Sequence, residues 1–199
     1  MSELPVEVGI AQLTHPGETD SGDRCVVKVA ENRVVIGVID GLGHGAEAAL
    51  AAQAAADVVE TFSHESVGAL MVRCHERLRK TRGAAITLIA IDVATRQLDW
   101  LGAGNVAAVL LHFGQSGTSW RKELLVRSGT AGASLPSMAV SSLNIERGDV
   151  VAAATDGVNL RFIDDVRPGL RPQQLAESLL ARHQTARDDA LVVVARLKT

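Results

Sequence analysis

The segment from Val34 to Ile39 is apolar throughout and ends in a carboxylate, Asp40, which three glycines follow within five residues. An apolar run rich in β-branched residues predicts a strand buried on both faces. The alanine-rich run from Ala46 to Val59 then predicts a helix. Because bare glycine backbone lets a ligand approach closely, a carboxylate at the mouth of this strand indicates a binding site.

Most of the chain consists of apolar runs separated by turn residues, and the helical segments are grouped between sets of strands. This order predicts an α+β layered sandwich, as a single domain over residues 1–199, in place of an alternating βαβ fold. We expect one hairpin through Glu31-Asn32 and another through Arg147-Gly148-Asp149. The predicted strands are residues 6–13, 25–30, 33–39, 84–92, 97–101, 106–113, 120–127, 138–145, 150–155 and 191–197. The predicted helices are residues 46–59, residues 66–80 and a segment with Pro172 in its first turn.

The bulk composition excludes several classes of partner. A formal net charge of −3 argues against nucleic acid, whose binding requires a basic excess. No apolar run approaches the roughly 20 residues of a membrane-spanning helix, so no membrane is expected. Cys25 and Cys74 form neither a CxxC pair nor a disulfide framework, which predicts a reducing, cytoplasmic location.

Four carboxylates share one context: Asp23, Asp40, Asp156 and Asp188 each lie at the end of a predicted strand, beside glycine or another aspartate. Taken singly, an Asp-Gly pair after a strand is most often a turn. Strands of one sheet can bring their ends together, however, and converging acids repel unless a cation neutralises them. Oxygen ligands without converging histidine or cysteine favour Mg²⁺ or Mn²⁺ over zinc.

These motifs, in this order, resemble the metal-dependent protein phosphatases (the PPM superfamily), and more narrowly their bacterial SpoIIE/RsbU/RsbX branch, over nearly the whole chain. The matching motifs are Ser21-Gly22-Asp23, Asp40-Gly41-Leu42-Gly43-His44-Gly45, Gly83-Ala84-Ala85, Ala103-Gly104-Asn105, Thr155-Asp156-Gly157 and Arg187-Asp188-Asp189-Ala190. The residues of the motif that begins at Asp40 are most similar to those of the stressosome phosphatase. The resemblance implies a four-layer α/β/β/α sandwich, with two antiparallel β-sheets flanked by helices and a two-metal centre at one edge.

The resemblance also implies the site residues. Asp40 would bridge both metals, the Gly41 carbonyl would bind one of them, Asp156 and Asp188 would hold the second, and Asp23 would contribute directly or through water. Two cations can activate water and shield the phosphoryl oxygens, so no protein nucleophile is required. The implied activity is dephosphorylation of phosphoserine or phosphothreonine, with phosphorylated STAS-domain proteins of a stressosome as partners and two Mn²⁺ or Mg²⁺ ions as cofactors.

The chain departs from the pattern of the eukaryotic relatives at three positions. Gly22 replaces a carboxylate ligand, Glu18 aligns with their phosphate-binding arginine, and Leu42 aligns with the histidine that follows their Asp-Gly pair. His44 lies two residues later and is a candidate proton donor to the leaving oxygen. A histidine at a helix start can equally cap or pack there, and both interpretations stay open.

Other functions are compatible with parts of the sequence. Within the phosphatases, the substrate could be an anti-anti-sigma factor. Outside them, the chain could be a catalytically silent module that binds a phosphoprotein, although its aspartates argue against this. Gly41-x-Gly43-x-x-Ala46 formally satisfies the dinucleotide fingerprint, which also requires a second parallel strand. The loop containing Asp164-Asp165, Arg161, Arg167 and Arg171 is either a solvated loop or a docking surface.

Overall fold

Two antiparallel five-stranded sheets form the centre of the molecule in the computed structural model, which describes residues 6–30, 32–114, 117–124, 127–135, 137–185 and 187–198. The first sheet has the order β1 (Val6–Leu13), β10 (Ala190–Leu197), β9 (Val150–Ala154), β6 (Ala107–Gly114) and β7 (Gly117–Glu123). The second has the order β2 (Asp23–Ala30), β3 (Arg33–Gly41), β4 (Ala84–Asp92), β5 (Gln97–Ala103) and β8 (Ser141–Asn144). The helices are α1 (Ala46–Phe62), α2 (Val67–Leu78), α3 (Pro172–His183) and the 3₁₀ helix η1 (Leu160–Asp165).

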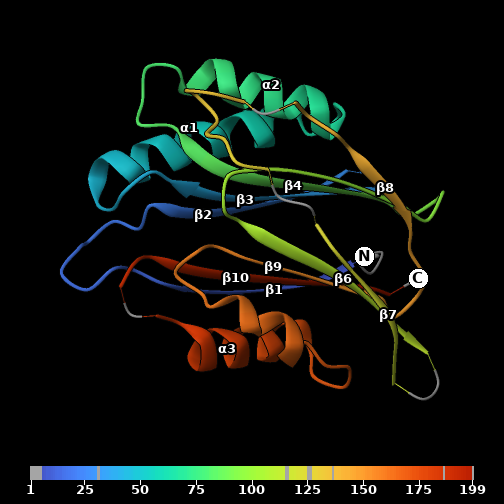
Figure 1. Cartoon of the computed structure of the whole chain (residues 1–199). Coiled ribbons are helices and arrows are strands. Elements are labelled where there is room, and N and C mark those ends of the chain that lie inside the picture. The colour runs from blue at the N-terminus through green and yellow to red at the C-terminus, as the bar shows by residue number, and fades with distance from the viewer. Residues whose placement is uncertain are drawn as a thin grey trace.

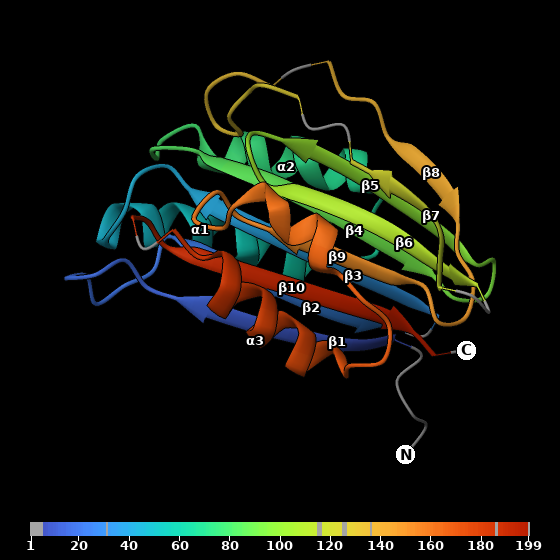
Figure 2. The same ribbon diagram turned by 60° about the horizontal axis from the view of Figure 1, so that its bottom comes forward.

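The sheets stack face to face, and helices cover both outer faces (Figure 1). Helices α1 and α2 pack on the β2–β8 sheet, and α3 packs on the β1–β7 sheet, as the rotated view also shows (Figure 2). Three apolar clusters fill the three interfaces between these four layers. The α/β/β/α sandwich that the resemblance implied is therefore confirmed.

The helices begin and pack as their residues dictate. Helix α1 follows Gly45, whose φ of 74° favours glycine. Its alanines allow close approach to the sheet: a Cβ added to Gly41 would lie 2.2 Å from the carbonyl oxygen of Ala48. Ser66 caps α2, because its side chain accepts a hydrogen bond from the Ala69 backbone N–H. Helix α3 has Pro172 in its first turn, as predicted.

Strands β2 and β3 form the predicted hairpin, and its register determines the position of two candidate ligands. Asp23 at the start of β2 is directly opposite Asp40 near the end of β3. Strand β4 runs antiparallel to β3 on its other side. Both neighbours of β3 are therefore antiparallel to it, whereas a dinucleotide-binding fold requires a parallel one. The glycines around Gly41 do not belong to such a fold.

The second predicted hairpin is wrong. Strand β8 is shorter than expected and pairs with β5 in one sheet, whereas β9 pairs with β10 and β6 in the other. The turn at Arg147-Gly148-Asp149 therefore carries the chain between sheets. All five residues of β9 are buried, as suits a central strand, whereas β8 alternates between half-buried and exposed positions at a sheet edge.

Several element boundaries differ from expectation, among them the start of β2 at Asp23 and the end of β3 at Gly41. Strand β7 covers residues 117–123 where 120–127 was predicted, and residues 125 and 126 lie outside the described part of the chain. The 3₁₀ helix η1 was not predicted, because its six residues are too few for a periodic signal. Within the described ranges, no helix combines the length and apolar character that crossing a bilayer requires.

Candidate metal centre

Asp23 and Asp40 lie opposite each other at the open end of the β2–β3 hairpin. Burial raises the pKa of Asp23 from 3.8 to about 7, against the effect of a hydrogen bond from Thr155. Burial likewise raises the pKa of Asp40 from 3.8 to about 8, and repulsion by Asp23 adds to this. Near neutral pH a large fraction of these carboxyl groups is therefore protonated unless a cation replaces the proton.

Asp156 and Asp188 come from the other sheet. Asp156 follows β9 and Asp188 precedes β10, and because these strands are antiparallel neighbours both residues lie at the same sheet edge. Burial raises the pKa of Asp156, and the charge of Asp188 raises it further. Both residues also raise the pKa of Asp40 from across the sandwich. The two sheets thus bring the four predicted aspartates into one electrostatic cluster.

Two polar side chains that sequence reasoning did not assign orient these carboxylates. The Thr155 hydroxyl donates to Asp23 Oδ2 at 2.7 Å and accepts from the Leu191 N–H at 2.9 Å. The bond to Asp23 links the two sheets. The Asn105 amide donates to Asp156 Oδ2 at 2.6 Å. Both lie within motifs on which the family resemblance rests, and this was the only signal in the sequence for their roles.

Asp189 has a structural role, unlike the neighbouring Asp188. It is 3% exposed, and its two carboxylate oxygens accept hydrogen bonds from the backbone N–H groups of His15 and Gly22, each at 2.8 Å. These bonds fasten the loop before β2 to the strand end that carries Asp188. Asp189 therefore positions the backbone around the site.

The backbone at Gly22 and Gly41 is too close to its surroundings for side chains. The Gly41 N–H donates to the Gly22 carbonyl at 3.0 Å. A Cβ on Gly22 would lie 2.9 Å from the Ala48 Cβ, 3.2 Å from Asp189 Oδ2 and 3.4 Å from the Gly41 carbonyl oxygen. There is no room at position 22 for the carboxylate that the eukaryotic relatives carry, and Asp23 is left as the acid from this loop.

The cluster has the chemistry of a divalent-cation site. No lysine or arginine in the described part of the chain forms an ion pair with these four aspartates. Carboxylate and carbonyl oxygens are the donors that Mg²⁺ and Mn²⁺ prefer. No three of the aspartates have ligand oxygens within 4.8 Å of one another among the described residues. Ionised carboxylates repel one another, and bound cations would offset this repulsion.

His44 lies on the glycine-rich loop before α1 and is exposed. Its Nδ1 is 2.7 Å from Glu18 Oε1, and its ring stacks on that of His15 with centroids 4.7 Å apart. Because an ionised carboxylate can only accept, the Nδ1–H of His44 donates to Glu18 and leaves Nε2 available. Glu18, which aligns with the phosphate-binding arginine of the eukaryotic relatives, thus orients His44.

Comparison with known proteins identifies the family. A family model described as Stage II sporulation protein E (SpoIIE) matches residues 30–198. The chain belongs to the SpoIIE family. Phosphoserine phosphatase RsbX of Bacillus subtilis (strain 168) is 28% identical over 192 residues, which cover 95% of this chain and 93% of RsbX.

Solved structures agree with the SpoIIE assignment. A crystal structure of RsbX in complex with magnesium matches with a TM-score of 0.87 at 25% identity, over 100% of this chain and 98% of that one. A chain from a structural study of the bacterial stressosome matches with a TM-score of 0.85 at 28% identity, over 96% of this chain and 99% of that one. The resemblance to the metal-dependent phosphatases and its SpoIIE/RsbU/RsbX branch is confirmed.

Proposed function

We propose that this protein is a metal-dependent phosphoserine/phosphothreonine protein phosphatase. The observation that carries the proposal is the aspartate cluster, which lies at one edge of a SpoIIE-family sandwich and has no basic partner in the described chain. Asp23 is buried, Asp40 and Asp188 are half-buried, and Asp156 is exposed. A silent phosphoprotein-binding module would gain nothing from it, because burying uncompensated acids costs stability.

Asp40 would bridge two Mn²⁺ or Mg²⁺ ions and the Gly41 carbonyl would bind one of them. Asp156 and Asp188 would hold the second, with Asp23 contributing directly or through water. When bound, the ions would supply an activated water and neutralise the phosphoryl oxygens. The chain's own part is to keep the four carboxylates oriented, through the hydrogen bonds of Thr155 to Asp23 and of Asn105 to Asp156.

The cysteines support this chemistry over a thiolate mechanism. Burial raises the pKa of both Cys25 and Cys74 to about 12. A nucleophilic cysteine requires the opposite shift, because the thiolate is the reactive form. Both thiols are free, which also supports the proposed cytoplasmic location.

Phosphorylated STAS-domain proteins of a stressosome are the proposed substrates. The likeness to RsbX and to a chain from a stressosome study supports this choice. An anti-anti-sigma factor is the alternative substrate within the same class of phosphatases.

Release of phosphate from a phosphorylated STAS-domain protein tests the proposal. We expect turnover with Mn²⁺ or Mg²⁺, none with chelator, and none by the Asp156→Asn variant. If the enzyme dephosphorylated a phosphorylated anti-anti-sigma factor faster in the same assay, that protein would become the assigned substrate. Stable binding of the phosphoprotein without turnover, in the presence of bound metal, would contradict the enzyme and favour the binding module.

His44 is proposed as the proton donor to the leaving serine or threonine oxygen, oriented by Glu18. His44→Ala should slow hydrolysis of a phosphoserine peptide by about a hundredfold. Hydrolysis of para-nitrophenyl phosphate should change little, because nitrophenolate leaves without a proton, and metal affinity should stay the same. Glu18→Gln is the matched variant and should have a smaller effect of the same kind. An equal loss on both esters, or an unchanged pH–rate profile, would remove His44 from this role.

A further inference from the structure

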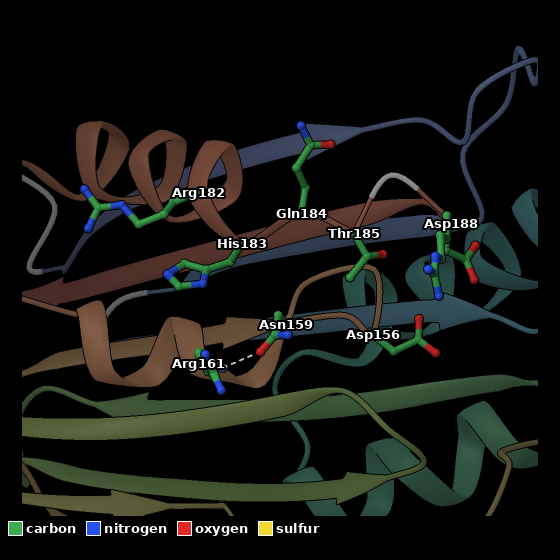
Figure 3. Close-up of a pocket in the computed structure, with 9 residues that line it drawn as sticks. Asp156, Asn159, Arg161, Arg182, His183, Gln184, Thr185 and Asp188 are labelled. Atoms are coloured by element: carbon green, nitrogen blue, oxygen red, sulfur yellow. Dashed lines mark hydrogen bonds between the residues drawn. The ribbon is translucent and has the colours of Figure 1, made fainter.

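A cleft of about 710 Å³ begins at the candidate metal centre and lies where β9 ends, α3 ends and β10 begins. One wall comes from the segment that follows β9, from Asp156 to Arg161. The other comes from the end of α3 and the residues after it, Arg182 to Thr185, and from Arg187 and Asp188 before β10. Asp156 and Asp188 lie at one end of this group of residues, and Arg161 and Arg182 lie toward the other (Figure 3). The cleft is therefore continuous with the proposed metal ligands.

Backbone hydrogen bonds hold the two walls together. The Asn159 N–H donates to the His183 carbonyl at 2.9 Å, and the Thr185 N–H donates to the Gly157 carbonyl at 2.8 Å. The Asn159 side chain in turn accepts from the Arg161 N–H at 3.0 Å (Figure 3). The cleft is thus preformed, and a ligand would not have to order its walls.

Two arginines of the cleft are available to a ligand. Arg182 is not one of them, because it forms an ion pair with Asp165 at 3.2 Å, and His183 contacts the same carboxylate at 2.9 Å. Arg161 and Arg187 are exposed, and in the described ranges no carboxylate lies within ion-pair distance of either. In a chain with a net charge of −3, unpaired positive charge along a cleft that begins at the metal centre indicates an anionic ligand.

We propose that this cleft binds acidic side chains of the substrate protein that flank its phosphorylated residue, through Arg161 and Arg187. The inference rests on the proposed phosphatase function. A phosphoryl group at Asp156 and Asp188 would place the neighbouring residues of an extended substrate in the cleft, since each spans only about 3.3 Å. The planar guanidinium presents paired N–H donors that match a carboxylate, which makes arginine well suited to this recognition.

Two synthetic phosphoserine peptides test the inference. They differ only in the flanking residues, which are Asp and Glu in one and Asn and Gln in the other. For the Arg161→Ala/Arg187→Ala double variant with Mn²⁺, we expect kcat/KM on the acidic peptide to fall about tenfold. Values for the neutral peptide and for para-nitrophenyl phosphate should not change. Arg147→Ala is the control, because Arg147 is exposed and precedes β9 at the end opposite to Asp156.

A binding measurement separates this inference from the phosphatase activity. Fluorescence anisotropy with the acidic peptide carrying an unphosphorylated serine, in chelator, should give a Kd about tenfold weaker for the double variant and a Kd that weakens with salt. Unchanged binding and unchanged selectivity in the double variant would overturn the inference. An equal loss on para-nitrophenyl phosphate would also overturn it, because the arginines would then bind the phosphoryl group itself. No turnover of any ester would instead contradict the proposed function, while the anisotropy would still test the cleft.

Discussion

Replacement of Asp40 by asparagine is expected to lower metal-dependent phosphate-ester hydrolysis at least about a thousandfold, because the bridging ligand of both ions would be lost. The same change should stabilise the metal-free protein at pH 8 by about 2 kcal/mol, since the amide keeps the shape of the side chain and removes its buried charge. This combination, higher stability with lost activity, is characteristic of a site whose acids are strained without their cations.

Steady-state hydrolysis and thermal unfolding in chelator measure the two effects. Asp57→Asn, the same chemical change on the exposed face of α1, is the control and should alter neither quantity. An Asp40→Asn protein that retains metal-dependent turnover would contradict the assignment of the site. A metal-free variant less stable than the parent would show that Asp40 stabilises the fold through contacts other than the cluster.

The metal-free protein is expected to lose stability as the pH rises from about 5 to about 8. The native pKa is about 7 for Asp23 and about 8 for Asp40, against 3.8 in the absence of the fold. Between these values the native state binds more protons than the unfolded chain, so the free energy of unfolding falls with pH and levels off above about 8. Because the two carboxylates are coupled, we expect a total loss of about 3 kcal/mol, less than two independent shifts would give.

Added Mg²⁺ or Mn²⁺ should abolish most of this loss, because the ions bind the deprotonated form and stabilise the native state. Denaturant titrations at several pH values, with chelator and with metal, measure it, and the difference between the parent and Asp40→Asn isolates the cluster. A stability that rises between pH 5 and 8 in chelator would mean that these aspartates are paired with a cation of the protein.

The sequence was sufficient for the parts of the fold that depend on local patterns. The β2–β3 hairpin follows from two apolar strands around a short turn, and its register places Asp23 against Asp40. The predicted α3 follows from Pro172 and from leucines on one face. Helix α1 follows from its alanine-rich run, although it extends three residues beyond the predicted end.

The sequence could not predict which sheet a strand joins or which residues of the two sheets contact each other. A Gly-containing turn between apolar runs looks the same whether it closes a hairpin or carries the chain across the sandwich, which is why β8 and β9 were wrongly paired. The bond from Thr155 to Asp23 joins residues 132 positions apart. Such contacts between the sheets arise only when both sheets are in place, and only the family resemblance pointed to them.

Hydrolysis of para-nitrophenyl phosphate with Mn²⁺, with and without chelator, and alongside Asp156→Asn, tests the central claim most directly. Binding of Mn²⁺ by calorimetry in the same samples shows whether the site is loaded. A two-metal phosphatase predicts turnover that requires manganese, stops with chelator and is lost in the variant. Turnover that persists in chelator or in Asp156→Asn, or a chain that binds no manganese, would contradict the assignment of these aspartates as the metal centre.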